Sequence, residues 1–351
     1  MVSSTENAVL AHESLPPAFV ISLDFELHWG VSERVDHPEH PYNANLYGAR
    51  EVVPRLLELF QRRKISATWA TVGKLFADGA EDLAHFVPTR RPAYHNKAVD
   101  TYRLPLGTSE QEDPLHFAPS LVQMIKDTPG QELACHTFSH YYCDEAGQDV
   151  DSFQADLEAA CTITSREGVQ CRSFVFPRNQ VLPDYLAVLH TVGLDVYRGN
   201  PARGLFGLPG NYRLLRAVIR GLRLADSFVN LTGHHTVPWS SLREGSLVNV
   251  RASQLLRPYS HKLRAFEPLR RHRVKAGLRA AARSGEIFHL WWHPHNFGKN
   301  MDENLTALED ILDEFERLRQ SHGMRSMTMD EVADVVFLGI DEVTRGEEVP
   351  G

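Results

Sequence analysis

Glu132-Leu133-Ala134-Cys135-His136-Thr137-Phe138-Ser139-His140 is the stretch of sequence from which the fold can be inferred. It follows a Pro-Gly turn and opens with apolar residues, which predicts a short strand that ends in two histidines. If the chain becomes helical after the strand, the i, i+4 spacing puts both rings on one face. There they can share a metal ion at about 2.0–2.1 Å. Taken alone, the pattern is equally compatible with a hydrogen-bonded histidine pair that holds no metal.

Three other stretches have the same design, in which a strand of buried type is followed by residues able to act as acid, base or ligand. They are 19–23 before Asp24-Phe25-Glu26, 173–176 before Pro177-Arg178-Asn179, and 287–292 before His293-Pro294-His295-Asn296. In parallel α/β folds, active sites are built at the carboxyl ends of the strands. We therefore expect these four segments to meet in one site.

Strand and helix patterns alternate over most of residues 18–200, which predicts a parallel sheet or barrel. Expected strands are 18–23, 64–73, 171–176, 194–197 and 287–292, and expected helices are 47–63, 119–126, 150–168, 182–192, 305–320 and 328–338. Pro54 would have to lie in the first turn of its helix. We expect a flexible leader over 1–17, one domain over 18–338 with a basic insertion around 201–284, and a disordered tail over 339–351.

Composition excludes several classes of protein. The 351 residues are 42% hydrophobic with a net charge of −8, which argues against general affinity for nucleic acid. No apolar run is long enough for a transmembrane segment, and the first residues lack the features of a signal peptide, so we expect a cytoplasmic protein. The four cysteines form no Cys-x-x-Cys pair and are expected to be buried thiols.

Arginine and lysine accumulate between residues 213 and 283. One interpretation is that these residues form the solvated faces of helices. The other is a surface for an anionic partner, such as a nucleotide or lipid diphosphate carrier or an acidic membrane, with peripheral membrane contact.

The four motifs, in this order, resemble those of the polysaccharide deacetylase family, the NodB-homology carbohydrate esterases. His136-Thr137-Phe138-Ser139-His140 matches the family's His-[Ser/Thr]-x-x-His motif, and Ser22-Leu23-Asp24-Phe25-Glu26 is similar to its Thr-Phe-Asp-Asp motif. Three further matches are similar to the family's second strand, its late Leu-x-His motif and the entry to its final helix: Ala67–Gly73, Trp291-Trp292-His293 and Met327–Glu331.

The resemblance implies a distorted (β/α) barrel of TIM-like type, a divalent metal, most often zinc, and hydrolytic removal of an acetyl group from an amino sugar. It implies an N-acetylated sugar or glycan precursor as substrate, which an anionic carrier could hold. His136 and His140 would be metal ligands, Asp24 or Glu26 would be the third ligand and the base, and His293 would be the acid. Metal-activated water and a paired base and acid suit this hydrolysis.

Two departures from the family pattern stand out. Phe25 occupies the place of the second, metal-binding aspartate, so Glu26, on the same face of the strand as Asp24, would have to supply that ligand. Alternatively, Asp24 binds the metal and Glu26 is the base. Arg178 follows Pro177 rather than preceding the prolines, and it would steer the base, bind a substrate carboxylate or phosphate, or lie on the surface.

On the opposite wall, Trp292 is expected to stack on a sugar ring, with packing of both tryptophans in the core as the alternative. His295 and Asn296 would contact the substrate. Two other functions remain open: a hydrolase of a non-sugar amide, with or without metal, and an inactive carbohydrate-binding relative.

Overall fold

The structure is a computed structural model that describes residues 15–35, 37, 39–201 and 213–346. Most of the expected leader, residues 1–14, lies outside these ranges. A ten-stranded sheet has the order β6-β7-β5-β4-β3-β2-β1-β9-β8, and β10 pairs with β1. All its strand pairs are parallel except β6 with β7. The predicted α/β fold with a curled, distorted barrel is confirmed.

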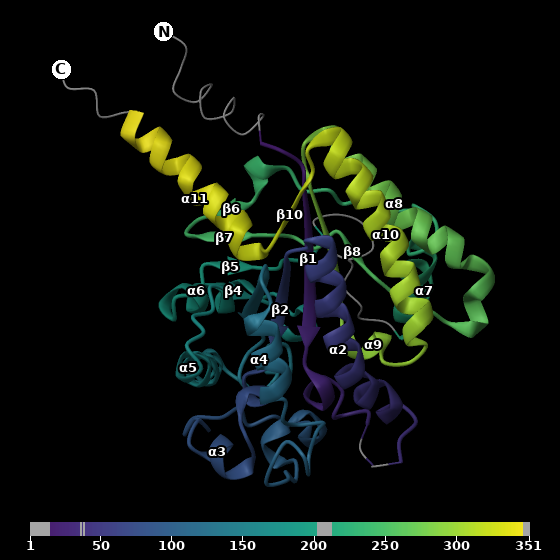
Figure 1. Ribbon diagram of the computed structural model, residues 1–351. Helices are drawn as coiled ribbons and strands as arrows, with labels where there is room; N and C mark the ends of the chain where they lie inside the picture. The colour runs from purple at the N-terminus through teal and green to yellow at the C-terminus, as the bar shows by residue number, and fades with distance from the viewer. Residues whose placement is uncertain (1–14, 36, 38, 202–212, 347–351) are drawn as a thin grey trace, which may run out of the picture.

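The strands are β1 Ala18–Phe25, β2 Ala67–Thr71, β3 Gln131–Cys135, β4 Ser173–Phe174, β5 Val196–Tyr197, β6 Arg243–Glu244, β7 Leu247–Asn249, β8 Gln254–Leu255, β9 Ile287–Trp292 and β10 Arg325–Met327. The helices are α2 Asn43–Arg63, α3 Ala80–Ala84, α4 Pro119–Asp127, α5 Val150–Arg166, α6 Pro183–Thr191, α7 Arg213–Asp226, α8 Glu267–Ser284, α9 Pro294–Phe297, α10 Met301–His322 and α11 Met329–Gly346. Figure 1 shows α2, α8 and α10 on one side of the central strand β1 and α4, α5 and α6 on the other.

β1 is the central strand, and all eight of its residues are buried. It pairs with β9 along most of its length, with β10 over residues 18–20 and with β2 over residues 22–25. A strand buried on both faces needs an almost continuous apolar sequence, which residues 18–23 supply. The polar side chain of Asp24 therefore lies near the point where the parallel strands β1, β2 and β9 end side by side.

The chain between β7 and β8 joins the two ends of the curled sheet. Ala252 donates its backbone N–H to Gly199 just after β5 at 2.9 Å, and Ser253 donates to His289 of β9 at 2.8 Å. The carboxyl ends of β1, β3, β4, β5 and β9 consequently face a common centre, as the four strand-end motifs predict.

α2 corrects one expectation. Pro54 lies in the middle of a helix that begins at Asn43, four residues before the predicted start, and not in its first turn. The buried apolar side chains of this helix recur at helical spacing, and they are Leu46, Ala49, Val52, Val53, Leu56, Leu57, Leu59 and Phe60. Burial of this face outweighs the loss of one backbone hydrogen bond at proline.

The expected basic insertion around 201–284 is also corrected. Residues 202–212 lie outside the described ranges, but β6, β7 and β8 are strands of the main sheet, and α8 covers β9. Much of this segment is therefore part of the barrel itself.

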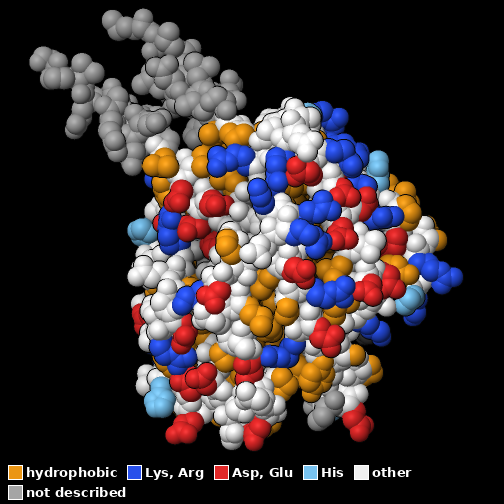
Figure 2. All heavy atoms as spheres, in the orientation of Figure 1, with side chains coloured by type: hydrophobic (Ala, Val, Ile, Leu, Met, Phe, Trp, Pro, Cys, Tyr) orange, Lys and Arg blue, Asp and Glu red, His pale blue; other side chains and the backbone are white. Residues whose placement is uncertain are grey.

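The basic residues of α8 are largely neutralised by neighbouring acids. Lys275 contacts Asp310 of α10 at 2.9 Å, and Arg279 contacts Glu314 at 2.7 Å. Arg270 and Arg273 are both 2% exposed, so they cannot form a surface for an anionic partner. Figure 2 shows blue and red side chains interspersed over this face. The helix α8 is therefore a packed helix with paired charges.

The disordered tail expected over 339–351 is wrong for its first part, because α11 continues to Gly346. The sequence from 329 to 346 contains no proline, and a single interior glycine costs a helix only about 1 kcal/mol. The remaining residues, 347–351, lie outside the described ranges.

Candidate metal centre

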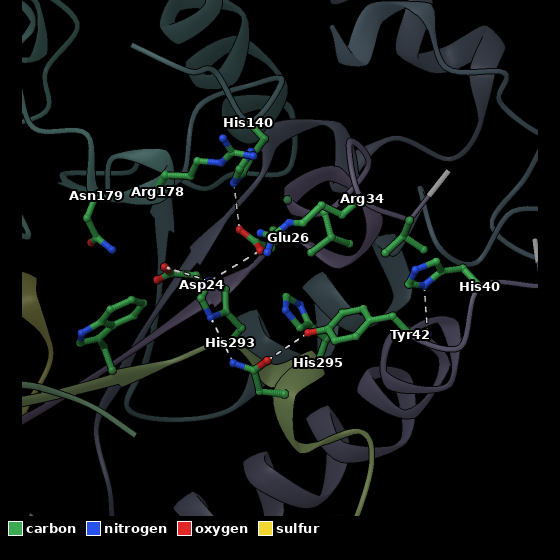
Figure 3. A pocket seen from close by; sticks show the side chains of 15 residues that line it. Asp24, Glu26, Arg34, His40, Tyr42, His140, Arg178, Asn179, His293 and His295 are labelled. Atoms are coloured by element: carbon green, nitrogen blue, oxygen red, sulfur yellow. Dashed lines mark hydrogen bonds and ion pairs between the residues drawn. The ribbon is translucent and has the colours of Figure 1, made fainter. Parts of the chain in front are cut away.

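The first carboxylates of the site come from the end of β1. Asp24 lies in the strand, and Glu26 directly precedes the 3₁₀ helix Leu27–Gly30, where the chain turns at Leu27 with a φ of 45°. Both side chains are buried and point into the same pocket (Figure 3). Phe25, between them, points the other way and packs against Trp69 at 6.4 Å between ring centroids. The expected shared face of Asp24 and Glu26 is therefore present.

The two histidines lie on a loop after β3 and not on a helix, which corrects the sequence-based geometry. Thr137 and His140 have φ values of 63° and 59°, in the left-handed region that side chains other than glycine seldom adopt. Asp156 of α5 fixes this loop, because its carboxylate accepts the backbone N–H groups of Phe138 at 2.7 Å and Ser139 at 3.3 Å. The strained loop turns both imidazoles toward Glu26.

Glu26, His136 and His140 together form a group whose ligand atoms all lie within 4.8 Å of one another. Glu26 Oε2 is 2.9 Å from Nε2 of His140 and 3.4 Å from Nε2 of His136. Asp24 does not belong to this group, so its expected role as a metal ligand is not supported by the geometry. Glu26 is the carboxylate of the group.

The surroundings of His136 suit a cation. Its Nδ1 lies 2.8 Å from the carbonyl oxygen of Val175, which can only accept, so Nδ1 is the donor of this hydrogen bond. Its Nε2 is buried, has no hydrogen-bond partner among the described residues and lies 3.4 Å from Oε2 of Glu26. A ring nitrogen and a carboxylate oxygen that face each other in this way are atoms that a bound cation could join.

The electrostatics of Glu26 agree with this view. Burial by itself would raise the pKa of Glu26, but His293, His140 and His136 outweigh it and hold the pKa well below its usual value. Burial lowers the pKa of His140, which favours the neutral imidazole that binds metals. Two imidazoles and one carboxylate can hold a divalent metal ion and leave positions open for water and substrate.

Asp24 is held by Arg198, a residue that the sequence analysis did not single out. The two nitrogens Nη1 and Nη2 of Arg198 contact Oδ1 and Oδ2 of Asp24 at 2.7 and 2.8 Å, and both side chains are buried. Burial would raise the pKa of Asp24, but the charge and hydrogen bonds of Arg198 outweigh it and lower the pKa. Arg198 directly follows β5, so the same strand-end rule could have identified it.

Arg198 is itself fixed on three sides. It donates to Ser22 Oγ at 2.9 Å and to Asn179 Oδ1 at 3.0 Å, and its guanidinium lies 4.3 Å from the ring centre of Trp291. These contacts fix the orientation of the Asp24 carboxylate beside the group of Glu26, His136 and His140.

His293 lies on the opposite wall, at the end of β9. Its Nε2 is 3.7 Å from Oδ2 of Asp24 and 3.6 Å from Oε1 of Glu26, and a quarter of its side chain is exposed to the pocket. Asn296 lies 3.4 Å from its other ring nitrogen and accepts a hydrogen bond from Tyr42 at 3.1 Å. The pair Asn296 and Tyr42 thereby orients the histidine.

His295 is buried beside His293, and their rings stack at 5.0 Å. Burial lowers the pKa of His295 to about 3, so its ring is neutral, and its Nδ1 has no hydrogen-bond partner among the described residues. His295 and Asn296 both line the pocket, as expected.

Two expectations are corrected. Trp292 is fully buried and stacks on Phe297 in the core, so it cannot contact a sugar, whereas Trp291 lines the pocket. Alternation of faces along β9 leaves only one of the two rings on the pocket side, and the sequence does not say which. Arg178 does not steer the base, because it pairs with Glu33 and lies 4.3 Å from the ring centre of Tyr142.

The pocket has a volume of about 510 Å³ and holds the site at its base. Asp24, Glu26, His140 and His293 line it, and Tyr42 and Arg178 form part of its rim (Figure 3). This is the size of a cleft that holds a small molecule or one to two sugar rings of a larger one.

Gly30 controls the position of Glu26. A Cβ atom at this position would lie 2.0 Å from Cδ and Oε1 of Glu26. We expect Gly30→Ala to displace the carboxylate and to lower both metal affinity and turnover, the latter by about 100-fold, as small misplacements of catalytic groups do. Metal titration and rate measurements check this.

Gly221→Ala is the matched control, because a Cβ there meets nothing within 4 Å and the residue lies in a helix. Wild-type metal affinity in Gly30→Ala would contradict the assigned role of Glu26.

Comparison with known proteins shows a match to a protein family over part of the chain. Residues 45–197 match the family model described as polysaccharide deacetylase, a range that includes His136 and His140. A search of curated proteins found no match.

Solved structures share the fold. A protein assigned as a polysaccharide deacetylase from Mycobacterium smegmatis has a TM-score of 0.56 at 13% identity, with 93% of this chain and 94% of that chain covered. A probable polysaccharide deacetylase from Pseudomonas aeruginosa PAO1 has a TM-score of 0.51 at 13% identity, with 94% and 91% covered. PuuE allantoinase has a TM-score of 0.51 at 12% identity, with 90% and 88% covered.

The family match includes the histidine loop, and these likenesses extend the shared fold over nearly the whole chain. Residues 45–197 thus match the polysaccharide deacetylase family, and the chain as a whole shares the fold of solved structures assigned to it.

Proposed function

We propose that this protein is a metal-dependent hydrolase that removes the N-acetyl group from an amino sugar of a glycan or glycan precursor. The observation that carries the proposal is the buried group of Glu26, His136 and His140 at the base of one pocket, with Asp24 and His293 beside it. The match of residues 45–197 to the polysaccharide deacetylase family supports the acetylated sugar as substrate.

Glu26, His136 and His140 would hold the metal, for which zinc is the best match to one carboxylate and two imidazoles. When bound, such an ion polarises the amide carbonyl and makes water a stronger nucleophile. The chain's own residues then handle the protons, and they do so from two sides of the scissile bond.

Asp24 is the proposed general base. Its carboxylate is kept ionised by Arg198 and accepts the proton of the attacking water. His293, 3.7 Å away, is the proposed acid that protonates the leaving amine nitrogen. Arg198 positions the base, and Asn296 positions the acid. Trp291, on the pocket wall, offers a face on which a sugar ring can stack.

A second candidate is hydrolysis of a non-sugar amide, which the fold likeness to an allantoinase favours. The two are separated by one experiment: release of acetate from N-acetylated mono- and oligosaccharides, and ring opening of allantoin, each with added zinc and with chelator. Acetate release that the chelator abolishes supports the deacetylase. Turnover of allantoin alone, or acetate release that survives chelation, would overturn it.

None of the helices among the described residues combines the length and apolar character needed to cross a bilayer.

A further inference from the structure

Lys74 is a buried lysine that the proposed mechanism does not use. It lies in the 3₁₀ helix Gly73–Phe76, directly after β2, and only 1% of it is exposed. Lysine is almost never fully buried unless its charge has partners. The partners of Lys74 include the two parts of the chain that carry the metal group, the turn after β1 and the loop after β3.

The first contact of Lys74 is with the turn that follows Glu26. Its ammonium nitrogen Nζ lies 4.5 Å from the ring centre of Trp29, within the range of a cation–π contact. The backbone N–H of Trp29 donates to the carbonyl oxygen of Glu26 at 3.0 Å, so both residues belong to one turn. The indole N–H of Trp29 donates to the backbone carbonyl of His116 at 2.9 Å, which fixes the ring. Lys74 therefore contacts a ring whose position is tied to the backbone of Glu26.

The second contact of Lys74 is with the loop that carries the two histidines. Nζ donates to Oγ1 of Thr101 at 3.0 Å, and this hydroxyl donates to the carbonyl oxygen of Ser139 at 2.8 Å. The backbone N–H of Lys74 donates to the carbonyl oxygen of Phe138 at 3.0 Å. The chain of hydrogen bonds from the ammonium group thus ends at the peptide bond that joins Ser139 to His140.

Asp156 supplies the opposite charge on the far side of one ring. Tyr102 places its ring centre 4.1 Å from Nζ of Lys74 and donates its hydroxyl to Oδ2 of Asp156 at 2.9 Å. Asp156 also accepts the backbone N–H groups of Phe138 and Ser139, and these donors favour its ionised form. A buried carboxylate of this kind needs a cation nearby.

The charge of Lys74 depends on its burial. Burial lowers the pKa of Lys74 to about 7, while the carboxylates of Asp156 and Asp100 oppose that shift. The ammonium form therefore prevails only below that pH, which sets the conditions for a test.

We infer that Lys74 is a positioning residue of the metal centre, because it joins the turn that carries Glu26 to the loop that carries His136 and His140. The inference rests on the metal-binding role that the proposed function gives to these three residues, and it adds what keeps them close together. The histidine loop has a strained, left-handed backbone at two positions, and such strain persists only where the surroundings hold it.

The first test measures metal affinity beside stability, since a merely structural lysine would change only the stability. Lys74→Met keeps nearly the length of the side chain but lacks its charge and its donors. At pH 6.5 this variant should bind Zn²⁺ roughly 10- to 100-fold more weakly than the wild type, as loss of a group that orients metal ligands does. Competition with a chromophoric chelator measures the affinity, and urea unfolding measures the stability.

Thr101→Val is the second variant, for the case that Lys74→Met does not fold. It keeps the charge and nearly the shape of the site but breaks the link to Ser139. Its affinity for Zn²⁺ should fall by about tenfold, the lower end of the same range. If Lys74→Met does not fold, the affinity of Thr101→Val decides the inference.

Leu312→Ala is the control for a loss of stability alone. Leu312 is 1% exposed in α10, belongs to the main hydrophobic core and is not among the described residues that line the pocket. Its truncation leaves a cavity and lowers the urea midpoint. The folded protein should nevertheless bind Zn²⁺ with wild-type affinity.

The second test uses Co²⁺ as a spectroscopic probe of the ligand geometry. Its visible absorption bands respond to the number and arrangement of the ligands. Lys74→Met should change the position or the intensity of these bands, and Leu312→Ala should keep the wild-type spectrum.

Three results would overturn the inference. The first is wild-type Zn²⁺ affinity in folded Lys74→Met, or in Thr101→Val if Lys74→Met does not fold. The second is an equal loss of affinity in Lys74→Met and Leu312→Ala. The third is a wild type that binds neither metal, which would overturn the proposed metal centre as well. The first two leave the metal centre in place, so the two failures are distinguishable.

Discussion

Asp24→Asn is expected to release acetate about 10²- to 10⁴-fold more slowly than the wild type, the usual contribution of a positioned general base. The amide has nearly the shape of the carboxylate and can still accept a hydrogen bond from Arg198, but it cannot take a proton from water. Because Asp24 is not one of the three clustered ligands, metal content should be unchanged. Acetate release and metal content of the same preparation check both statements.

The combination of lost turnover and retained metal separates the two roles that the sequence left open for Asp24 and Glu26. Glu26→Gln should lose metal as well as turnover, since Glu26 contacts both histidines. Should Asp24→Asn fail to fold, His293→Gln tests the proton transfer from the other wall. An Asp24→Asn protein with wild-type turnover, or one that loses its metal, would contradict the assignment of Asp24 as base.

Arg198→Met is expected to destabilise the folded protein at pH 7 by about 3–5 kcal/mol, because it leaves the buried carboxylate of Asp24 without its partner. That is a large share of the roughly 5–15 kcal/mol by which a domain is stable. Replacing both partners, in Asp24→Leu/Arg198→Met, should restore most of the stability without restoring turnover. Urea unfolding of the three proteins measures these differences.

The destabilisation should depend on pH in a definite direction. In the wild type Arg198 keeps the pKa of Asp24 below its unfolded value of 3.8, so the pair stabilises the fold above that pH and the benefit is lost only in stronger acid. In Arg198→Met burial is no longer offset, and the pKa of Asp24 rises above its unfolded value. The folded variant then binds the proton more tightly than the unfolded chain, so its stability falls as the pH rises above about 3.8.

The free energy of unfolding that Arg198→Met loses relative to wild type should therefore be smaller near pH 4 than at pH 7. A deficit that is the same at both values, or a double variant as unstable as the single one, would contradict a buried and ionised Asp24.

The fold was predictable because its main signal is local. The strand at residues 287–292 was predicted with its exact bounds, and β1 differs only by two further residues at its end. Both are apolar runs buried on two faces. The short strands β6, β7, β8 and β10 were missed, because strands of two or three residues carry too little pattern to distinguish them from loop.

The sequence predicted those site residues that directly follow the strands. Glu26, His136, His140 and His293 all face the pocket or the metal group, since parallel strands end at one edge of the sheet. Arg198 lies at the end of β5, where the strand-end rule could have pointed to it, but its pairing with Asp24 depends on which strands face each other across the barrel. Trp292 was predicted to lie in the pocket, whereas Trp291 lies there. Successive residues of a strand face opposite sides of the sheet, so a shift of one residue decides which ring lies in the core.

The backbone of the histidine loop could not be foreseen. A His-x-x-x-His spacing fits one helical face, but here the loop reaches the same convergence through two left-handed residues held by Asp156. The carboxylate that fixes this loop lies on α5, sixteen residues beyond His140, and no spacing rule connects the two.

The metal content of the purified protein tests the central claim most directly. Elemental analysis of the wild type, after dialysis against metal-free buffer and again after reconstitution with zinc, should give about one divalent ion per chain, as three protein ligands in one site require. His136→Ala/His140→Ala, measured beside it, should contain none. No metal in the wild type after reconstitution, or an equal amount in the double variant, would contradict a metal centre at Glu26, His136 and His140.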